Sequence, residues 1–248
     1  IEIAIEAIRK KLTGKKLTYK EIYSIMDEIS KNKLGDVLTT YFAASGYMKG
    51  FSDIELFYLT KAMVETGEKL KFKGIVADKH SIGGVPGTRT TLIVVPIVAR
   101  AGFTIPKSSS RAITTTNGTA DDMEILAPVN LKKEKIYEIV KKTNGCIVWW
   151  GSFKIAPADD VLINVERKLL FESYDKILVS IMAKKVAFGS THVVIDMPYG
   201  KTVKIHSLDE SRILQEKFEY LARKFNIKIR VLIHKTNQPA GRGIGAIL

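Results

Sequence analysis

The sequence has almost no cysteine and no long uninterrupted run of apolar residues. Its single cysteine, Cys146, excludes an intrachain disulfide, and the apolar neighbours of Cys146 favour a small core residue over a catalytic thiol. A membrane-spanning helix needs about 20 mostly apolar residues, and the first residues lack the features of a signal peptide. We therefore expect a soluble, cytoplasmic protein with no membrane partner.

Acidic residues are scarce relative to basic ones, which gives a formal net charge of +13. Such a charge attracts phosphorylated or polyanionic partners at long range but says nothing about the fold. The lysines are interleaved with acids, as at 132–135, and aromatic residues do not alternate with them as a stacking platform for nucleic acid requires. We favour a solvated lysine-rich face, then steering of phosphorylated small molecules, and we expect no nucleic-acid partner.

Helical periodicity dominates residues 1–70, which contain two capping boxes, Thr18–Glu21 and Ser52–Glu55. A third capping box, Ser207–Glu210, opens a helix near the other end of the chain. The helices predicted before that one lie near residues 1–12, 18–31, 36–47, 52–66, 88–100, from 119 or 120 onward, and 159–188. The predicted strands lie at 72–77, 103–106, 146–150, 191–197 and 227–233.

Helix-rich segments thus occur in two separated parts of a chain that is apolar enough to bury a sizeable core. We predict an α/β protein in which a discontinuous all-helical domain, 1–68 and 156–188, accompanies a mixed α/β domain, 71–152 and 190–248. The mixed domain is expected to hold a central, mostly parallel sheet. The chain starts without a methionine and stops within a glycine-rich segment, so we expect a piece of a longer protein.

A glycine-rich stretch, 78–91, follows the first predicted strand and precedes a predicted helix. Glycines let backbone N–H groups approach an anion, and a helix N-terminus offers unpaired donors and the positive end of a dipole. The stretch is not a Walker A loop, because no Gly-Lys-Ser/Thr ends it. Phosphate binding is favoured over a plain turn.

A second polar stretch, 107–121, follows the next predicted strand and concentrates hydroxyl groups around Arg111. Hydroxyls and an arginine can donate to phosphate oxygens, and Gly118-Thr119 precedes a helix. An ordinary polar loop with helix caps is an equal alternative. Two such loops after neighbouring strands could converge on one oxyanion.

Ordered motifs span nearly the whole chain. They are Asp78-Lys79-His80-Ser81 with Gly83-Gly84-Val85, Ser109-Ser110-Arg111-Ala112, Gly118-Thr119 with Asp121 and Glu124, and residues 156–159, 180–185 and 236–239. This series resembles the thymidine and pyrimidine-nucleoside phosphorylase superfamily. Within that superfamily, residues 83–87 and 109–114 are most similar to the archaeal AMP phosphorylases.

The resemblance implies the fold of nucleoside phosphorylases and phosphoribosyltransferases. It further implies phosphorolysis of a nucleoside 5′-monophosphate, AMP or else CMP or UMP, to free base and ribose 1,5-bisphosphate. Inorganic phosphate is then a co-substrate, with no cofactor and no metal, and the protein is a homodimer or larger homo-oligomer. A thymidine or pyrimidine-nucleoside phosphorylase is the alternative within the superfamily.

By the same resemblance, phosphate and base are bound by separate groups of residues. The phosphate-binding positions are Lys79, Ser81, Gly83, Thr90, Ser109, Arg111 and Thr119, and Arg111 is expected to support its loop. The base-binding positions are His80, Ser180 and Lys184. Ser180 and Lys184 are four residues apart and share one helix face, a spacing that also describes a solvated face.

Some positions depart from the pattern or stay open. Glu166 stands, by ungapped counting, where thymidine-type relatives carry a base-binding arginine, which puts pyrimidine recognition in doubt. We expect His80 or Asp159 to be the catalytic proton donor, with a structural hydrogen-bonding role for His80 and a helix cap for Asp159 as the alternatives. Arg89 and Lys107 are candidates for the 5′-phosphate, against a solvated surface role for each.

Two rivals remain. An anthranilate-type phosphoribosyltransferase would use a diphosphate donor and magnesium, for which Asp121-Asp122 is the one adjacent acid pair in a suitable loop. A basic nucleic-acid-binding module would bind long polymers with steep salt dependence.

Overall fold

The computed structural model describes residues 1–85, 87, 89–112, 118–169 and 173–241. The chain divides into two compact units: Ile1–Leu70 with Lys154–Gly189, and Lys71–Phe153 with Ser190–Leu248. We call them the helical unit and the α/β unit. Within the described residues, no helix is long and apolar enough to cross a membrane.

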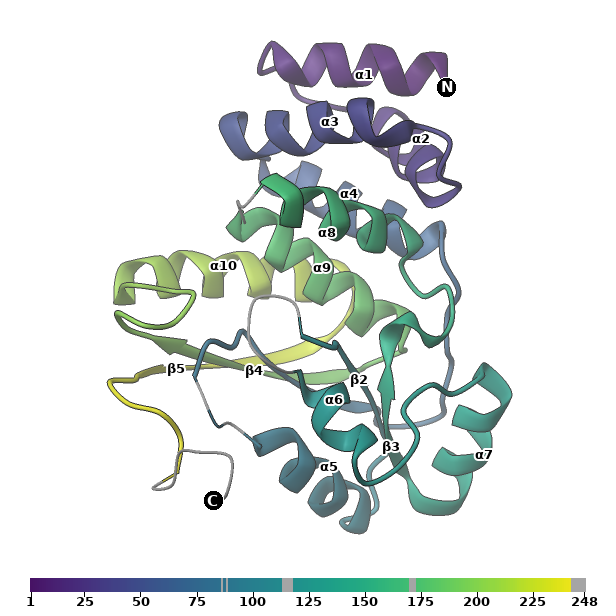
Figure 1. Ribbon diagram of the computed structural model, residues 1–248, viewed down its shortest axis with the longest axis vertical. Helices are drawn as coiled ribbons and strands as arrows, with labels where there is room; N and C mark the ends of the chain where they lie inside the picture. Colours follow the sequence, from purple (N-terminus) through teal and green to yellow (C-terminus); the bar gives the residue numbers. More distant parts are fainter. Residues whose placement is uncertain (86, 88, 113–117, 170–172, 242–248) are drawn as a thin grey trace. The chain divides into compact units, whose positions relative to one another are not determined.

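The helical unit is built from helices, some of which begin at a side-chain cap (Figure 1). Its helices are α1 (Glu2–Leu12), α2 (Tyr19–Ser30), α3 (Gly35–Lys49), α4 (Asp53–Glu65), α8 (Pro157–Leu169) and α9 (Tyr174–Ala187). The predicted capping boxes at Thr18 and Ser52 are both confirmed. The helical pattern predicted over 159–188 is two helices, α8 and α9, whose connection lies partly outside the described residues.

The core of the helical unit contains a buried ion pair as well as apolar side chains. Helix α4 packs against both α2 and α9. Lys11 Nζ lies 2.9 Å from Glu55 Oε1, and both side chains are buried. Glu55 also accepts hydrogen bonds from the backbone N–H groups of Leu17 and Ser52. One carboxylate therefore fixes α1, the loop after it and the start of α4.

The α/β unit contains five parallel strands in its described residues. The strands are β1 (Ala77–Ser81), β2 (Ile105–Ser109), β3 (Gly145–Trp149), β4 (His192–Tyr199) and β5 (Lys228–Lys235). One sheet has the order β1-β4-β5, the other pairs β2 with β3, and a parallel bridge between Val76 and Thr104 links them. The predicted central sheet is therefore two adjoining parallel sheets.

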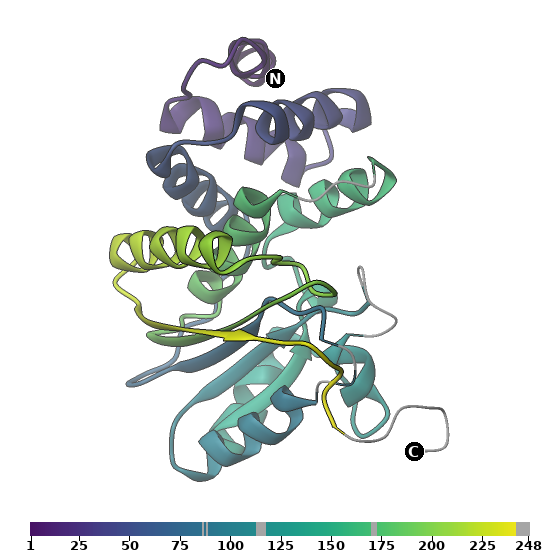
Figure 2. The same ribbon diagram turned by 90° about the vertical axis from the view of Figure 1, so that its left-hand side faces the viewer.

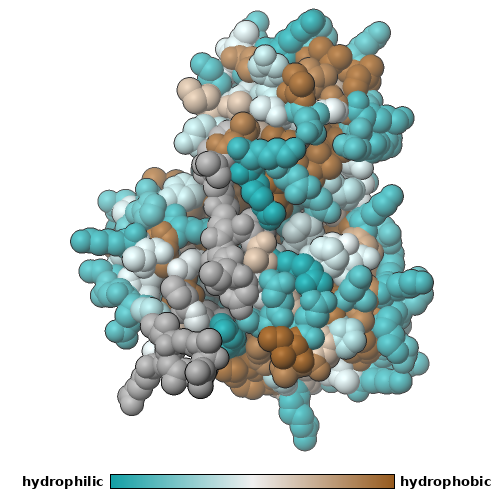
Figure 3. Space-filling view, viewed as in Figure 1, coloured by the Kyte–Doolittle hydropathy of each residue, from teal (hydrophilic) through white to brown (hydrophobic). Residues whose placement is uncertain are grey.

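Helices cover the sheets of this unit (Figures 1 and 2). The helices are α5 (Thr90–Arg100), α6 (Thr119–Glu124), α7 (Lys133–Thr143), α10 (Leu208–Lys224) and the short 3₁₀ helix Trp150–Ser152. The capping box at Ser207 is confirmed at the start of α10, which lies along β4 and β5 and buries Leu214 and Phe218. The chain after α6 exposes Ile125 and Leu126. Figure 3 shows apolar patches among polar residues on the face that Figure 1 presents.

The first two strands begin later than the sequence predicts, and this changes where the polar motifs lie. A strand was predicted at 72–77, but β1 begins at Ala77, and β2 begins at Ile105 instead of residue 103. The prediction was wrong because it sought apolar, β-branched runs, whereas both strands bury polar side chains such as Lys79 and Ser109. The Asp78–Ser81 motif is therefore part of strand β1 and not of the loop after it.

Candidate functional site

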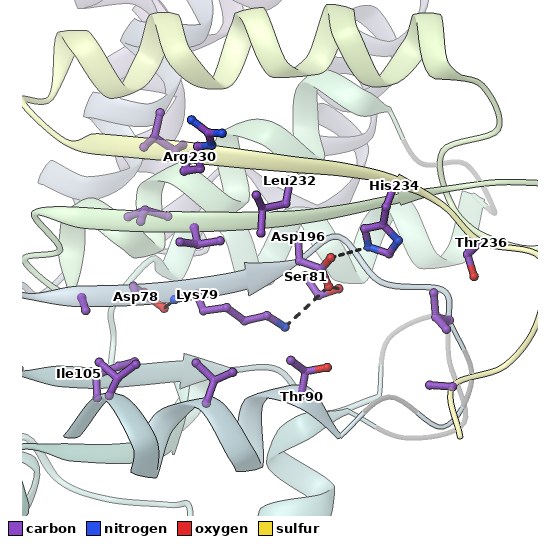
Figure 4. A pocket seen from close by; sticks show the side chains of 18 of the residues that line it. Asp78, Lys79, Ser81, Thr90, Ile105, Asp196, Arg230, Leu232, His234 and Thr236 are labelled. Carbon is purple, nitrogen blue, oxygen red and sulfur yellow. Dashed lines mark hydrogen bonds and ion pairs between the residues drawn. The ribbon is translucent and has the colours of Figure 1, made fainter. Parts of the chain in front are cut away.

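Alternating residues of β1, β4 and β5 turn their side chains to one face of the three-stranded sheet. A pocket of about 1160 Å³ lies on this face, bounded on the other side by α5 (Figure 4). Its charged lining residues are Asp78, Lys79, Asp196, Lys228, Arg230 and Lys235. The positive excess in this lining suits an anionic ligand.

Lys79, Ser81 and Thr90 meet at one end of this pocket (Figure 4). Lys79 and Ser81 lie at the carboxyl end of strand β1. They are two residues apart and therefore on the same face. Thr90 is the first residue of α5, where a helix end carries partial positive charge. The structure thus brings together three of the predicted phosphate-binding residues.

The side chains at this end of the pocket are joined by one carboxylate, Asp196 of β4. Ser81 Oγ donates to Asp196 Oδ2 over 2.9 Å, and Lys79 Nζ lies 3.9 Å from the same oxygen. On the other side, His234 Nε2 of β5 lies 2.7 Å from Asp196 Oδ1. The Lys79 residue is only 7% exposed, so this ammonium group depends on nearby polar atoms in place of water.

The glycines after β1 adopt a backbone that side chains disfavour. Gly83 and Gly84 both have φ of 93°, in the left-handed region. A Cβ atom on Gly84 would also lie 3.0 Å from the backbone of Val203, whereas the space around Gly83 is open. The predicted backbone contact of Gly83 with phosphate stays a prediction, and residues 86 and 88 of this loop lie outside the described residues.

His80 does not lie with Lys79 and Ser81. It sits between them in β1, so its side chain leaves the opposite face of the strand, and it does not line the pocket. Its predicted roles in base binding and catalysis have no support from this arrangement and stay predictions.

The second polar loop is pinned at its ends. Ser109 ends β2 and is buried, and its hydroxyl donates to the carbonyl of Ser110 over 3.3 Å. The backbone of Gly118 passes so close that a Cβ atom there would lie 2.4 Å from that carbonyl oxygen. Thr119 follows as the first residue of α6. Residues 113–117, between these ends, lie outside the described residues.

Arg111 links the two described ends of this loop through acidic partners. Its guanidinium binds both oxygens of Glu124, one at 2.8 Å, and lies 3.2 Å from Asp121 Oδ1. The guanidinium also stacks on Trp149, 4.8 Å from the ring centroid. Asp121 in turn accepts from the backbone N–H groups of Ala112 and Gly118. These contacts agree with the predicted supporting role, while direct phosphate contact by Arg111 stays a prediction.

The two candidates for a 5′-phosphate differ in burial. Lys107 is 4% exposed, and its ammonium donates to the carbonyl of Ser108. The solvated alternative for Lys107 is therefore wrong. Arg89 is half exposed and lies 3.6 Å from Asp122.

The helical unit holds a second cluster, centred on the fully buried Asp159 in the first turn of α8. Asp159 Oδ2 accepts from Ser180 Oγ at 2.7 Å and from Lys184 Nζ at 2.6 Å, while Oδ1 accepts from Lys176 Nζ at 2.5 Å. Lys176 lies 3.7 Å from Glu166, the residue at the doubtful base-binding position. We call these residues the Asp159 network.

The charge state of Asp159 argues against its predicted role as proton donor. Burial acts to raise the pKa of this carboxyl, but the charges and hydrogen bonds of Lys176 and Lys184 outweigh burial and hold the pKa far below its usual range. Asp159 therefore stays ionised and has no proton to give at neutral pH. Its bonds to Ser180 and Lys184 suit a role in orienting them.

The neighbouring carboxyl, Asp160, behaves in the opposite way. Burial and, after it, the negative charge of Asp159 raise the pKa of Asp160 to about 7, because the two lysines oppose them only in part. One of its oxygens is buried without a hydrogen-bond partner in the described part of the chain. Asp160 is thus protonated in the folded protein at pH values where it is ionised in the unfolded chain.

Replacing Asp160 with asparagine is expected to stabilise the protein at pH 8 but not at pH 4. Because the folded-state pKa is the higher one, Asp160 lowers the free energy of unfolding progressively as pH rises from about 4 to 7. Asparagine removes this loss, a gain on the order of 2 kcal/mol above pH 7. Urea unfolding across this range checks it, with the exposed Asp53→Asn as control. Equal pH dependence in both variants would contradict it.

Sequence reasoning missed Asp196, His234 and Lys176. The one available signal was Asp196 itself, a carboxylate inside the apolar run of a buried parallel strand. His234 and Lys176 carried no local signal, because only their tertiary neighbours mark them. No group of three or more His, Cys, Asp or Glu side chains placed to hold a metal ion occurs among the described residues.

Comparison with known families matches this architecture over both units. Residues 5–67 match the helical bundle domain of a glycosyl transferase family, and residues 73–229 match the α/β domain of that family. The second match covers more than half of the chain, so the chain belongs to this glycosyl transferase family.

Curated proteins similar to this chain include phosphorylases. The chain is 45% identical over 246 residues to an AMP phosphorylase of Thermofilum pendens and 43% identical to a protein named "Putative thymidine phosphorylase" of Legionella pneumophila. Each alignment covers 99% of this chain and 48% of the relative, so the chain spans about half the length of these relatives.

A solved structure supports the fold alone. Anthranilate phosphoribosyltransferase of Thermus thermophilus matches with a TM-score of 0.72 at 19% identity, over 87% of this chain and 63% of that one. The predicted relation to the phosphoribosyltransferase fold is confirmed.

Proposed function

We propose that this protein is a phosphorylase that converts a nucleoside 5′-monophosphate and phosphate to free base and ribose 1,5-bisphosphate. The observation that carries the proposal is the convergence of Lys79, Ser81 and Thr90 on one basic pocket. The similarity to AMP phosphorylases over 99% of the chain supports the nucleotide as substrate. Nucleotide breakdown or salvage in the cytoplasm would be its setting.

In the proposed reaction, an oxygen of phosphate attacks C1′ of the ribosyl group while the bond from C1′ to the base nitrogen breaks. The base leaves with the bonding electrons and takes up a proton, so no side chain has to act as nucleophile. Lys79 would neutralise phosphate and hold it in line, with the hydroxyls of Ser81 and Thr90 as further donors. Because a hydroxyl rotates freely, Ser81 can donate to phosphate while still near Asp196.

The remaining predicted residues complete the proposal. Ser109 and Thr119 would add donors to phosphate from the second loop, with Arg111 as its support. In the helical unit, Ser180 and Lys184 would contact the base, oriented by Asp159. Glu166 and Lys176 join the same network, so the base would meet a different set of charges than an arginine supplies. A homodimer or larger homo-oligomer is part of the proposal.

Phosphate-dependent release of free base from AMP, and not from adenosine or thymidine, is the expected result for the full-length protein. The 5′-phosphate would contribute binding energy that a nucleoside lacks. Chromatography of reactions with AMP, CMP, UMP, adenosine and thymidine, each with and without phosphate, measures this directly. Release from thymidine alone would contradict the nucleotide assignment and favour a nucleoside phosphorylase.

A magnesium titration separates the phosphorylase from a phosphoribosyltransferase. In the structure, Asp121 and Asp122 each engage an arginine, Arg111 and Arg89 respectively. We expect base release to be unchanged by a chelator. Activity that needs magnesium and a phosphoribosyl diphosphate would overturn the proposal.

A further inference from the structure

The side chain of Asp196, in the middle strand of the larger sheet, contacts a side chain from each of the two neighbouring strands. In the parallel register, Asp196 stands opposite Ser81 of β1 on one side and opposite Leu232 of β5 on the other. His234 is two residues beyond Leu232 and therefore on the same face. The carboxylate thus reaches donors from both neighbouring strands, as Figure 4 shows.

A carboxylate here is costly for a site that binds an anion. Asp196 Oδ2 is within 3.9 Å of the lysine that would neutralise phosphate, so its negative charge acts against the ligand. The arrangement is favourable only if the carboxylate supplies something that outweighs this repulsion. What it supplies is geometry, because both of its oxygens engage donors that face the pocket.

We propose that Asp196 is a positioning residue of the phosphate site, holding the Lys79 ammonium and the Ser81 hydroxyl where phosphate binds, with His234 fixing the carboxylate in turn. This inference rests on the proposed function, because phosphate is the ligand that Lys79 and Ser81 would share. A long lysine side chain loses much rotamer freedom when it binds a ligand. A partner that holds the chain beforehand removes most of that cost from binding.

The inference predicts a selective effect on phosphate. In the full-length protein, Asp196→Asn keeps an oxygen that can accept from Ser81 but loses the charge that holds Lys79. We expect the KM for phosphate to rise about tenfold in Asp196→Asn and about a hundredfold in Asp196→Ala, while the KM for the nucleotide stays within about twofold. If Asp196 only repelled the anion, the KM for phosphate would fall in both variants.

A double-mutant cycle tests whether Asp196 acts through Ser81. If it does, Asp196→Ala, which removes the acceptor of the Ser81 hydroxyl, should weaken phosphate binding much less in a Ser81→Ala background than in the unchanged protein. Full additivity of the two changes would overturn the inference. The matched control is Asp209→Asn, an exposed aspartate in the first turn of α10, which should leave both KM values unchanged.

Calorimetric binding of inorganic phosphate separates this inference from the proposed function. Weaker phosphate binding in Asp196→Asn, in a protein that releases no base, would leave the inference standing and remove the proposed function. Base release by the unchanged protein, together with an unchanged phosphate Kd in Asp196→Asn, would leave the proposed function standing and remove the inference. An unchanged protein that binds no phosphate at all would overturn both.

Discussion

Replacing Lys79 with alanine is expected to lower kcat/KM for phosphate about a thousandfold, measured as phosphate-dependent release of base. The ammonium lies in a pocket largely shielded from water, where a charge interacts more strongly than at the surface. Its loss leaves the hydroxyls of Ser81 and Thr90 facing the anion together with the unneutralised Asp196. Both the binding of phosphate and its in-line orientation should suffer.

Two control variants test whether the effect of Lys79→Ala comes from losing a positive charge at this position. Lys141→Ala removes an exposed lysine of α7 and should leave the rate unchanged. Lys79→Arg keeps the charge but not the compact shape of the ammonium, so partial recovery is expected. A Lys79→Ala protein that keeps a normal KM for phosphate and a normal kcat would remove Lys79 from the site.

Replacing Asp159 with alanine is expected to destabilise the helical unit by about 3–5 kcal/mol, because Lys176 and Lys184 would stay buried without their shared carboxylate. The KM for the nucleotide should also rise, since Ser180 and Lys184 lose the partner that orients them. Urea unfolding and base-release kinetics of the same variant measure the two effects.

Acidity provides a second check on Asp159. The lysines hold the pKa of Asp159 below its unfolded value, so its stabilisation is complete above about pH 4 and is lost only in stronger acid. In an Asp160→Asn background, which removes the titration of that neighbour, the difference in unfolding free energy between the protein with Asp159 and its Asp159→Ala variant should therefore be constant from pH 5 to 8. A difference that disappears within this range would show that Asp159 is not held ionised.

A surface ion pair supplies the matched control for Asp159. Asp36 and Lys168 lie 3.3 Å apart in the same unit, but their side chains are 71% and 73% exposed. Water and salt screen such a pair, so Asp36→Ala should cost under about 1 kcal/mol. Equal losses for Asp36→Ala and Asp159→Ala would mean that burial does not strengthen the Asp159 network.

Local chemistry made the first four helices predictable. The first four helices begin and end within about two residues of the predicted positions, since caps such as Thr18–Glu21 act between near neighbours. The strands β1 and β2 were misplaced because their buried positions carry Lys79 and Ser109, which only a folded pocket can accommodate. Strands that bury polar side chains are therefore not located by a search for apolar runs.

The sequence by itself determined the starts of the first four helices and of α10, the alternation of helical and α/β segments and the family motifs around Lys79 and Ser180. Only the tertiary structure decided which side chains share a site. Ser81 and Asp196 are 115 residues apart, and parallel strand pairing brings them within 2.9 Å. The charge state of Asp159 was likewise decided by folding, because burial and two lysines from α9 determine its pKa. Such contacts depend on the packing of distant segments, which no local pattern encodes.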